Sequence, residues 1–128
     1  MNDISAATLE RPKTASSASG ERPIDLVHLA RMTLGERSLE REVLQLFDRQ
    51  ATLLIERMQG APAAALASLA HTLKGSARAI GAGCVARAAE TVELMGAADE
   101  ADLRRALAAL GSATQEARAF IAELLRTH

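Results

Sequence analysis

One histidine and one lysine stand three residues apart near the middle of the chain, where residues 70–82 read AHTLKGSARAIGA. The imidazole of His71 can act as a nucleophile or accept a proton near neutral pH. Lys74 is one of only two lysines beside 13 arginines, and its ammonium group is a compact, mobile point charge. A phosphoryl group on a His71 nitrogen would lie within reach of Lys74. The spacing therefore fits the covalent handling of an anionic group.

The helix that contains these residues turns its apolar side the other way. At about 100° per residue, His71 lies roughly 160° from Leu73 and faces away from the core. The expected buried stripe shares the side of Leu73: Leu66, Leu69, Ala70, Leu73, Ala77 and Ile80. The outer face around His71 carries small residues and two cations: Ala64, Ala67, Ser68, Gly75, Lys74 and Arg78.

Gly75 is the least expected residue of this outer face. Glycine inside a helix costs about 1 kcal/mol relative to alanine. It can relieve crowding between two helices, or it can leave room for a large partner to approach His71. An ordinary solvated face is rich in Glu, Lys, Arg and Gln, so the bare surface favours the approach of a partner.

The segment from Ala70 to Ala82 resembles the signature of histidine-containing phosphotransfer (HPt) domains. In that signature the phosphorylated histidine is followed by Leu-Lys-Gly-Ser and then by Gly-Ala, as in His71, Leu73–Ser76 and Gly81–Ala82 here. The preceding short helix, glycine turn and long helix with LFDRQ are similar as well. The resemblance covers residues 23–95 well, and the last helix only in length and periodicity.

The resemblance implies a phosphoryl shuttle between receiver domains. His71 would take the group through Nε2 from a receiver domain of a hybrid sensor histidine kinase and pass it to the receiver domain of a response regulator. Lys74 and Arg78 would stabilise the anion, and Gly75 with Ala64, Ala67 and Ser68 would leave room for the receiver. A carboxylate on the next helix would orient the ring, for which Glu93 matches the family position and Glu90 competes.

The sequence offers no other catalytic apparatus. No carboxylate lies three or four residues from His71 to form a metal site, and no Walker or kinase glycine loop is present. Ser68, Ser76 and Cys84 lack an adjacent His and carboxylate. We therefore expect a phosphoryl carrier without a cofactor or metal of its own rather than an enzyme, with Mg²⁺ supplied by the partner receiver.

Composition and periodicity predict an all-α fold. The chain has 128 residues, 28 alanines and 18 leucines, but only 2% aromatic residues. Residues 1–22 are expected to be a disordered leader, and residues 23–128 a bundle domain. Helices are expected over residues 25–33, 38–60, 62–80, 84–95 and 99 to near the end, with Ser38 and Asp99 as caps. They would form an antiparallel up-and-down four-helix bundle with a short additional N-terminal helix.

The second helix is expected to bury an apolar stripe of Leu39, Val43, Leu46, Phe47, Leu54 and Met58.

Charge and cysteine content limit the partners and the compartment. The formal net charge is −1 and both signs are scattered, so nucleic acid and membrane are poor partners. One cysteine and no secretory or membrane segment indicate a cytoplasmic, and by composition bacterial, protein. Two alternatives stay open: a helical adaptor that docks receivers without carrying phosphate, and the phosphoacceptor domain of a chemotaxis-like kinase.

Overall fold

A computed structural model describes residues 22–96 and 98–127 of the chain, and over these ranges it contains five helices and no strand. This confirms the all-α prediction. The predicted leader over residues 1–22 lies outside the described residues except for Arg22. The helices are α1 (Leu26–Met32), α2 (Arg37–Met58), α3 (Ala63–Ile80), α4 (Gly83–Leu94) and α5 (Glu100–Thr127).

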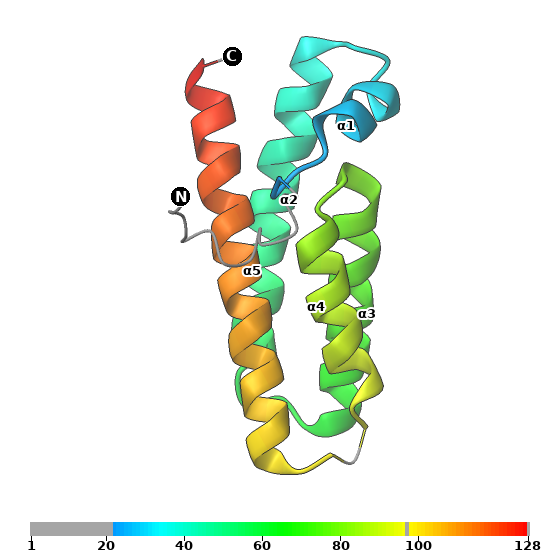
Figure 1. The fold of residues 1–128 in the computed structure, drawn as a ribbon, viewed down its shortest axis with the longest axis vertical. Coiled ribbons are helices and arrows are strands. Elements are labelled where there is room, and N and C mark those ends of the chain that lie inside the picture. Colours follow the sequence, from blue (N-terminus) through cyan, green and yellow to red (C-terminus); the bar gives the residue numbers. More distant parts are fainter. Residues whose placement is uncertain (1–21, 97, 128) are drawn as a thin grey trace, which may run out of the picture.

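The four long helices run along the same axis and reverse direction from one to the next, as Figure 1 shows. α3 packs most extensively against α4, α2 packs on α3, and α5 packs on both α4 and α2. The short α1 lies near the end of the molecule where α3 passes into α4. The outer face of α3 is therefore bordered by α2 on one side and by α4 on the other.

The turn between α3 and α4 also anchors α1. Gly81 ends α3 in the left-handed region, at φ 86°, and its carbonyl accepts a hydrogen bond from the Asp25 backbone N–H at 2.9 Å. A Cβ at Gly81 would lie 3.1 Å from Asp25, so both the conformation and the close approach favour glycine. His28 Nε2 adds a hydrogen bond to the Ala79 carbonyl at 2.8 Å. These contacts fix the end of α3.

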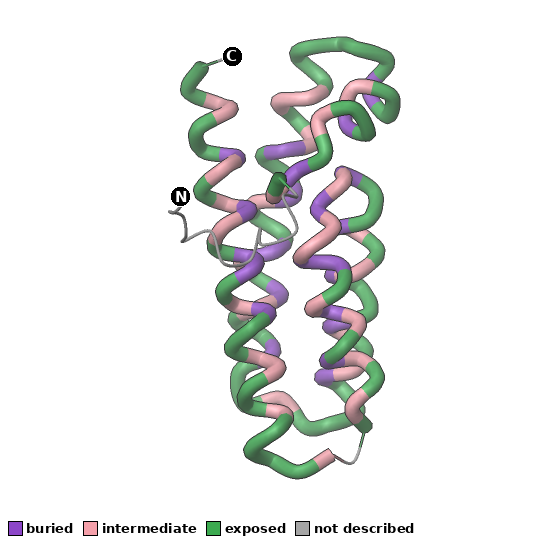
Figure 2. The backbone as a smooth tube through the Cα atoms, in the orientation of Figure 1, coloured by how far each residue is buried: buried purple, intermediate pink, exposed green. Residues whose placement is uncertain are grey.

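Alanines provide much of the packing between α3 and α4. Ala70, Ala77 and Ala89 are fully buried, together with the larger Leu73 and Val85. Figure 2 shows such buried positions recurring between exposed ones along the long helices. Small side chains allow two helices to approach closely. Side chains on the outer edges of α3 and α4 can therefore meet across the seam.

The predicted start of the second helix is wrong. Ser38 does not cap it; α2 begins at Arg37 after an extended Glu36, without a side-chain cap. Leu34 and Gly35 both adopt positive φ, so the chain turns before it reaches Ser38. The first helical hydrogen bond of α2 runs from the Glu40 N–H to the Glu36 carbonyl at 3.0 Å. α3 ends at Ile80 as expected and begins one residue later than expected, whereas α4 begins and ends one residue earlier.

The predicted stripe of α2 is partly wrong as well. Leu39 and Leu46 are exposed, and Val43 is half-buried. The predicted stripe omitted two residues that the structure buries, Leu44 and Ala51. Ala51 is fully buried, and Leu46 lies about 140° from it around the helix, so Leu46 falls on a flank. The buried residues of α2 are Leu44, Phe47, Ala51, Leu54 and Met58.

Candidate functional site

His71 lies on the outer face of α3, opposite the residues that this helix buries. Its side chain is 67% exposed. Leu69, expected in the core, is only half-buried. The other residues of the predicted stripe are buried: Leu66, Ala70, Leu73, Ala77 and Ile80. The helical period alone thus presents the imidazole to solvent.

A carboxylate of α4 holds one nitrogen of the His71 ring. The Nδ1 atom and Glu93 Oε2 are 2.7 Å apart. A carboxylate only accepts, so Nδ1 carries the proton of this hydrogen bond. In the neutral ring the lone pair then belongs to Nε2. The contact therefore selects the tautomer in which Nε2 is the nucleophilic nitrogen.

The same carboxylate also holds Lys74. The Lys74 Nζ atom lies 2.6 Å from Glu93 Oε1, and the lysine side chain is only 12% exposed. The contact with Lys74, and after it the hydrogen bond from His71, lower the pKa of Glu93. Glu93 is consequently an ionised carboxylate at neutral pH, shared between the histidine and the lysine.

A second carboxylate lies one helical turn away. Glu90 Oε2 is 4.0 Å from Lys74 Nζ and 3.7 Å from Arg78 Nη2. Glu93 and Glu90 were both candidates for the ring. In the structure Glu93 contacts the ring, whereas these contacts of Glu90 are with the two cations.

The surface beside His71 is formed by residues with short side chains, so His71 projects above it. Ala64, Ser68 and Gly75 are exposed and Ala67 is half-buried. A Cβ added at Gly75 would meet no atom within 4 Å. Crowding against another described helix therefore gives no reason for this glycine. The space beside Gly75 is therefore open to solvent.

Sequence reasoning missed the apolar residues that flank this face. Leu94 of α4 is 74% exposed, and Leu46 and Leu53 of α2 are about half exposed. Ser76 Oγ donates to Gln50 Oε1 at 3.1 Å, which joins the α2 flank to α3. Leu46 lies about 40° from Gln50 around α2, whereas Leu53 lines a hollow with Arg118 of α5. The predicted stripe of α2 placed Leu46 in the core instead of on the surface.

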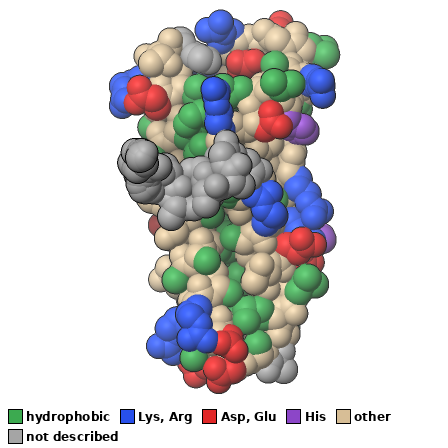
Figure 3. All heavy atoms as spheres, viewed as in Figure 1, with side chains coloured by type: hydrophobic (Ala, Val, Ile, Leu, Met, Phe, Trp, Pro, Cys, Tyr) green, Lys and Arg blue, Asp and Glu red, His purple; other side chains and the backbone are tan. Residues whose placement is uncertain are grey.

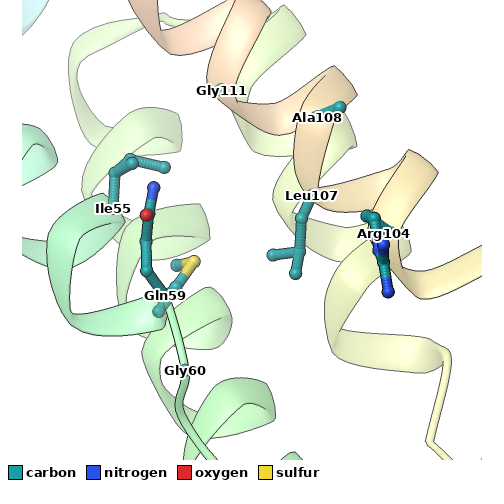
Figure 4. Close-up of a pocket in the computed structure, with 8 residues that line it drawn as sticks. Ile55, Gln59, Gly60, Arg104, Leu107, Ala108 and Gly111 are labelled. Carbon is teal, nitrogen blue, oxygen red and sulfur yellow. The ribbon is translucent and has the colours of Figure 1, made fainter. Parts of the chain in front are cut away.

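A cavity of about 470 Å³ lies between α2 and α5, away from the predicted site residues. Figure 4 shows apolar side chains such as Ile55 and Leu107 lining it, with Gln59 and Arg104 among them. It contains no histidine, cysteine or carboxylate side chain. The predicted site residues therefore lie on the α3–α4 face and not in this cavity.

Charges elsewhere on the molecule are mixed. Figure 3 shows basic side chains next to acidic ones on the face in view, without a broad surface of one sign. Within residues 22–96 and 98–127, no three metal-binding side chains come together. No helix in these ranges has the length and apolar character needed to cross a bilayer.

Comparison with known proteins identifies the family. Searches of curated proteins and of solved structures returned no match. A family model, the Hpt domain, matches residues 37–125, which is more than half of the chain and includes His71, Lys74 and Glu93. The members of this family are phosphocarrier modules that interact with receiver domains in two-component signalling. The chain belongs to the Hpt domain family.

Proposed function

We propose that this protein accepts a phosphoryl group on His71 from the phospho-aspartate of a hybrid sensor kinase's receiver domain and passes it to the receiver domain of a response regulator. The observation that carries the proposal is the shared carboxylate of Glu93. It lies 2.7 Å from His71 Nδ1 and 2.6 Å from Lys74 Nζ. One group thereby prepares the nucleophile and keeps a cation beside it.

In the forward step, the lone pair of His71 Nε2 attacks the phosphorus of the receiver's acyl phosphate. The N–P bond forms as the P–O bond to the receiver's aspartate breaks, and the aspartate leaves as a carboxylate. The Nδ1 proton stays in its hydrogen bond to Glu93, which stabilises the positive charge that develops on the ring. Transfer to the second receiver reverses these bond changes. The receiver domain would supply the Mg²⁺ that neutralises charge on the oxygens of the transferring phosphoryl group.

Lys74 is the cation nearest to the reacting group in this scheme. Its ammonium starts on Glu93 and swings toward the phosphoryl oxygens once they are attached to Nε2. A flexible four-carbon stem permits this movement. Arg78 lies two turns after His71 on the same face of α3 and adds a second positive charge.

The receiver would dock over the α3 face with its active-site aspartate above His71. Gly75, Ala64, Ala67 and Ser68 keep the surface low enough for the phosphoryl group to be reached. Exposed Leu46 of α2 and Leu94 of α4 supply apolar contact on the two flanks. An alternating four-helix bundle with the added α1 is the rigid support for this surface.

The chain acts in this proposal as a carrier with no cofactor of its own, in the cytoplasm, where receiver domains and their kinases meet. The transferred group is bound covalently, and the chain alone performs no net reaction. Docking without labelling would instead indicate the adaptor.

The direct test mixes the full chain with a receiver domain that carries labelled phosphoryl, in the presence of Mg²⁺. The wild type should gain acid-labile, alkali-stable label, and His71→Gln should gain none. The matched control is His28→Gln. His28 is an exposed histidine of α1 that contacts the Ala79 carbonyl of α3, the helix that carries His71. Label that persists on His71→Gln would exclude the assignment.

A further inference from the structure

We infer that Glu90 is a positioning residue that restrains the cations of the site, Arg78 and Lys74, in the unphosphorylated protein and thereby lowers the amount of phosphohistidine formed at equilibrium. This inference rests on the proposed function. It concerns a residue that contacts neither the ring in the structure nor the phosphoryl group in the scheme above.

The geometry separates the tasks of the two carboxylates of α4. Glu93 contacts both His71 and Lys74 at hydrogen-bonding distance. Glu90 reaches the two cations at 4.0 and 3.7 Å, which is ion-pair distance but too long for a hydrogen bond. Glu90 therefore attracts Arg78 and Lys74 without fixing them in one place.

The charges of this cluster cancel before phosphorylation. Lys74 and Arg78 bring two positive charges, and Glu90 and Glu93 bring two negative ones. A phosphoryl group on His71 adds a charge of about −1.5 to −2. Its arrival leaves the cluster with excess negative charge. Removing the charge of Glu90 while keeping Glu93 would leave a net positive cluster that favours the phosphorylated state.

The effect must be moderate because this pair is open to solvent. The side chains of Glu90 and Arg78 are 41% and 59% exposed. Exposed pairs contribute little and are screened by salt. We therefore expect a change of about two- to five-fold in the equilibrium constant, and not the loss of transfer.

The experiment measures the equilibrium of phosphoryl exchange between a pre-phosphorylated receiver domain and the full chain. Glu90→Gln should raise the ratio of phosphohistidine to free His71 about two- to five-fold at low salt. The increase should nearly vanish at about 1 M salt, where the screening length is near 3 Å. Glu100→Gln is the matched control, because it removes one carboxylate from an exposed pair with Arg104 on α5. It should leave the ratio unchanged.

A double-mutant cycle with Arg78→Gln tests the route of the effect. If Glu90 acts through Arg78, its removal should matter less once Arg78 is absent. An unchanged ratio in Glu90→Gln would overturn the inference. An increase of the same size in the Arg78→Gln background would also overturn it.

NMR relaxation of the Arg78 guanidinium and Lys74 ammonium in the unphosphorylated protein measures the restraint without any transfer. The Arg78 guanidinium should become more mobile in Glu90→Gln and stay unchanged in Glu100→Gln, whereas the Lys74 ammonium, which also contacts Glu93 at 2.6 Å, should change less. Absence of phosphoryl uptake by the wild type would reject the proposed function alone, whereas unchanged mobility in Glu90→Gln would reject the restraint.

Discussion

Two interfaces of the bundle, the α2–α5 seam and the α3–α4 seam, use similar charged residues in different ways. Between α2 and α5, Arg118 pairs with Asp48 at 2.6 Å and Arg41 donates to the Leu125 carbonyl at 2.9 Å. An apolar cavity lies near the other end of this seam. Between α3 and α4, the charges instead surround an exposed histidine, and one carboxylate contacts both the ring and a lysine.

The difference lies in the third group: the carboxylate between α3 and α4 contacts a histidine as well as a cation, whereas Asp48 pairs with Arg118 between α2 and α5. Asp48 and Arg118 join two helices, and each is about one third exposed. Glu93 contacts both His71 and Lys74, which in the proposed function are the nucleophile and the cation that moves toward the phosphoryl group. Carboxylates on the two seams should therefore respond differently to the same substitution.

The largest effect is expected at Glu93. Glu93→Ala removes the acceptor of the His71 Nδ1 proton and the partner of Lys74, so the rate of phosphoryl transfer should fall roughly ten- to hundred-fold. Glu93→Gln keeps an acceptor for the His71 ring, so its rate of phosphoryl transfer should fall less. Transfer kinetics from a phosphorylated receiver measure both. Asp48→Ala, the control on the other seam, should transfer at the wild-type rate; an equal loss there would erase the distinction between the seams.

Gly75 and Gly111, two helical glycines without close neighbours, provide a matched pair. Gly75 lies beside His71 and Gly111 lines the cavity on α5, and a Cβ at either would meet nothing within 4 Å. Gly75→Leu should slow transfer about ten-fold or more by holding the receiver away from the histidine. Gly111→Leu should leave transfer unchanged.

Both glycine substitutions should preserve helicity by circular dichroism and raise the free energy of unfolding by up to about 1 kcal/mol, since leucine favours helix over glycine. If transfer by Gly75→Leu equals that of the wild type, the low surface has no role in docking.

The seam between α2 and α5 should reveal itself in stability rather than transfer. Arg118→Ala removes the pair with Asp48, so the free energy of unfolding should fall by about 1 kcal/mol or less, as for a partly exposed ion pair. Denaturant unfolding gives this value. A reduced rate of phosphoryl transfer in a fully folded Arg118→Ala protein would contradict the separation of the two seams.

The smallest expected effect is the loss, at acidic pH, of the stability that Glu93 contributes to the folded protein. The pKa of Glu93 is lowered by Lys74 and then by His71, so its ionised form is favoured in the folded protein. The stability that it contributes is fully present above the ordinary pKa of a glutamate and is lost as pH falls through the lowered value. The difference in unfolding free energy between wild type and Glu93→Gln should therefore shrink in acid. A difference that grows as the pH falls would have the wrong sign for this site.

The sequence alone could predict the outer face of α3, because Leu66, Leu73 and Ile80 set the phase of the helix and leave His71 opposite. It could not choose between Glu93 and Glu90. That choice depends on the register of α4 against α3, which the turn at Gly81 sets through three-dimensional contacts.

Two other features depended on packing between helices. The phase of α2 was misjudged because Ala51, and not a leucine, lies at its buried centre. Lys74 was expected to contact a phosphoryl group, and the structure shows that it contacts Glu93. The face on which α3 places His71 was thus predictable, and the contacts that α4 makes with it were not.

The most direct test of the account is the position of the phosphoryl group on the ring. Protein with ¹⁵N-labelled histidine, phosphorylated by a receiver domain and observed by ³¹P and ¹⁵N NMR, should show phosphorus bonded to Nε2 of His71. The Nδ1 atom of the same ring should keep its proton and its hydrogen bond to Glu93. Phosphorus bonded to Nδ1, or to any residue other than His71, would contradict the account.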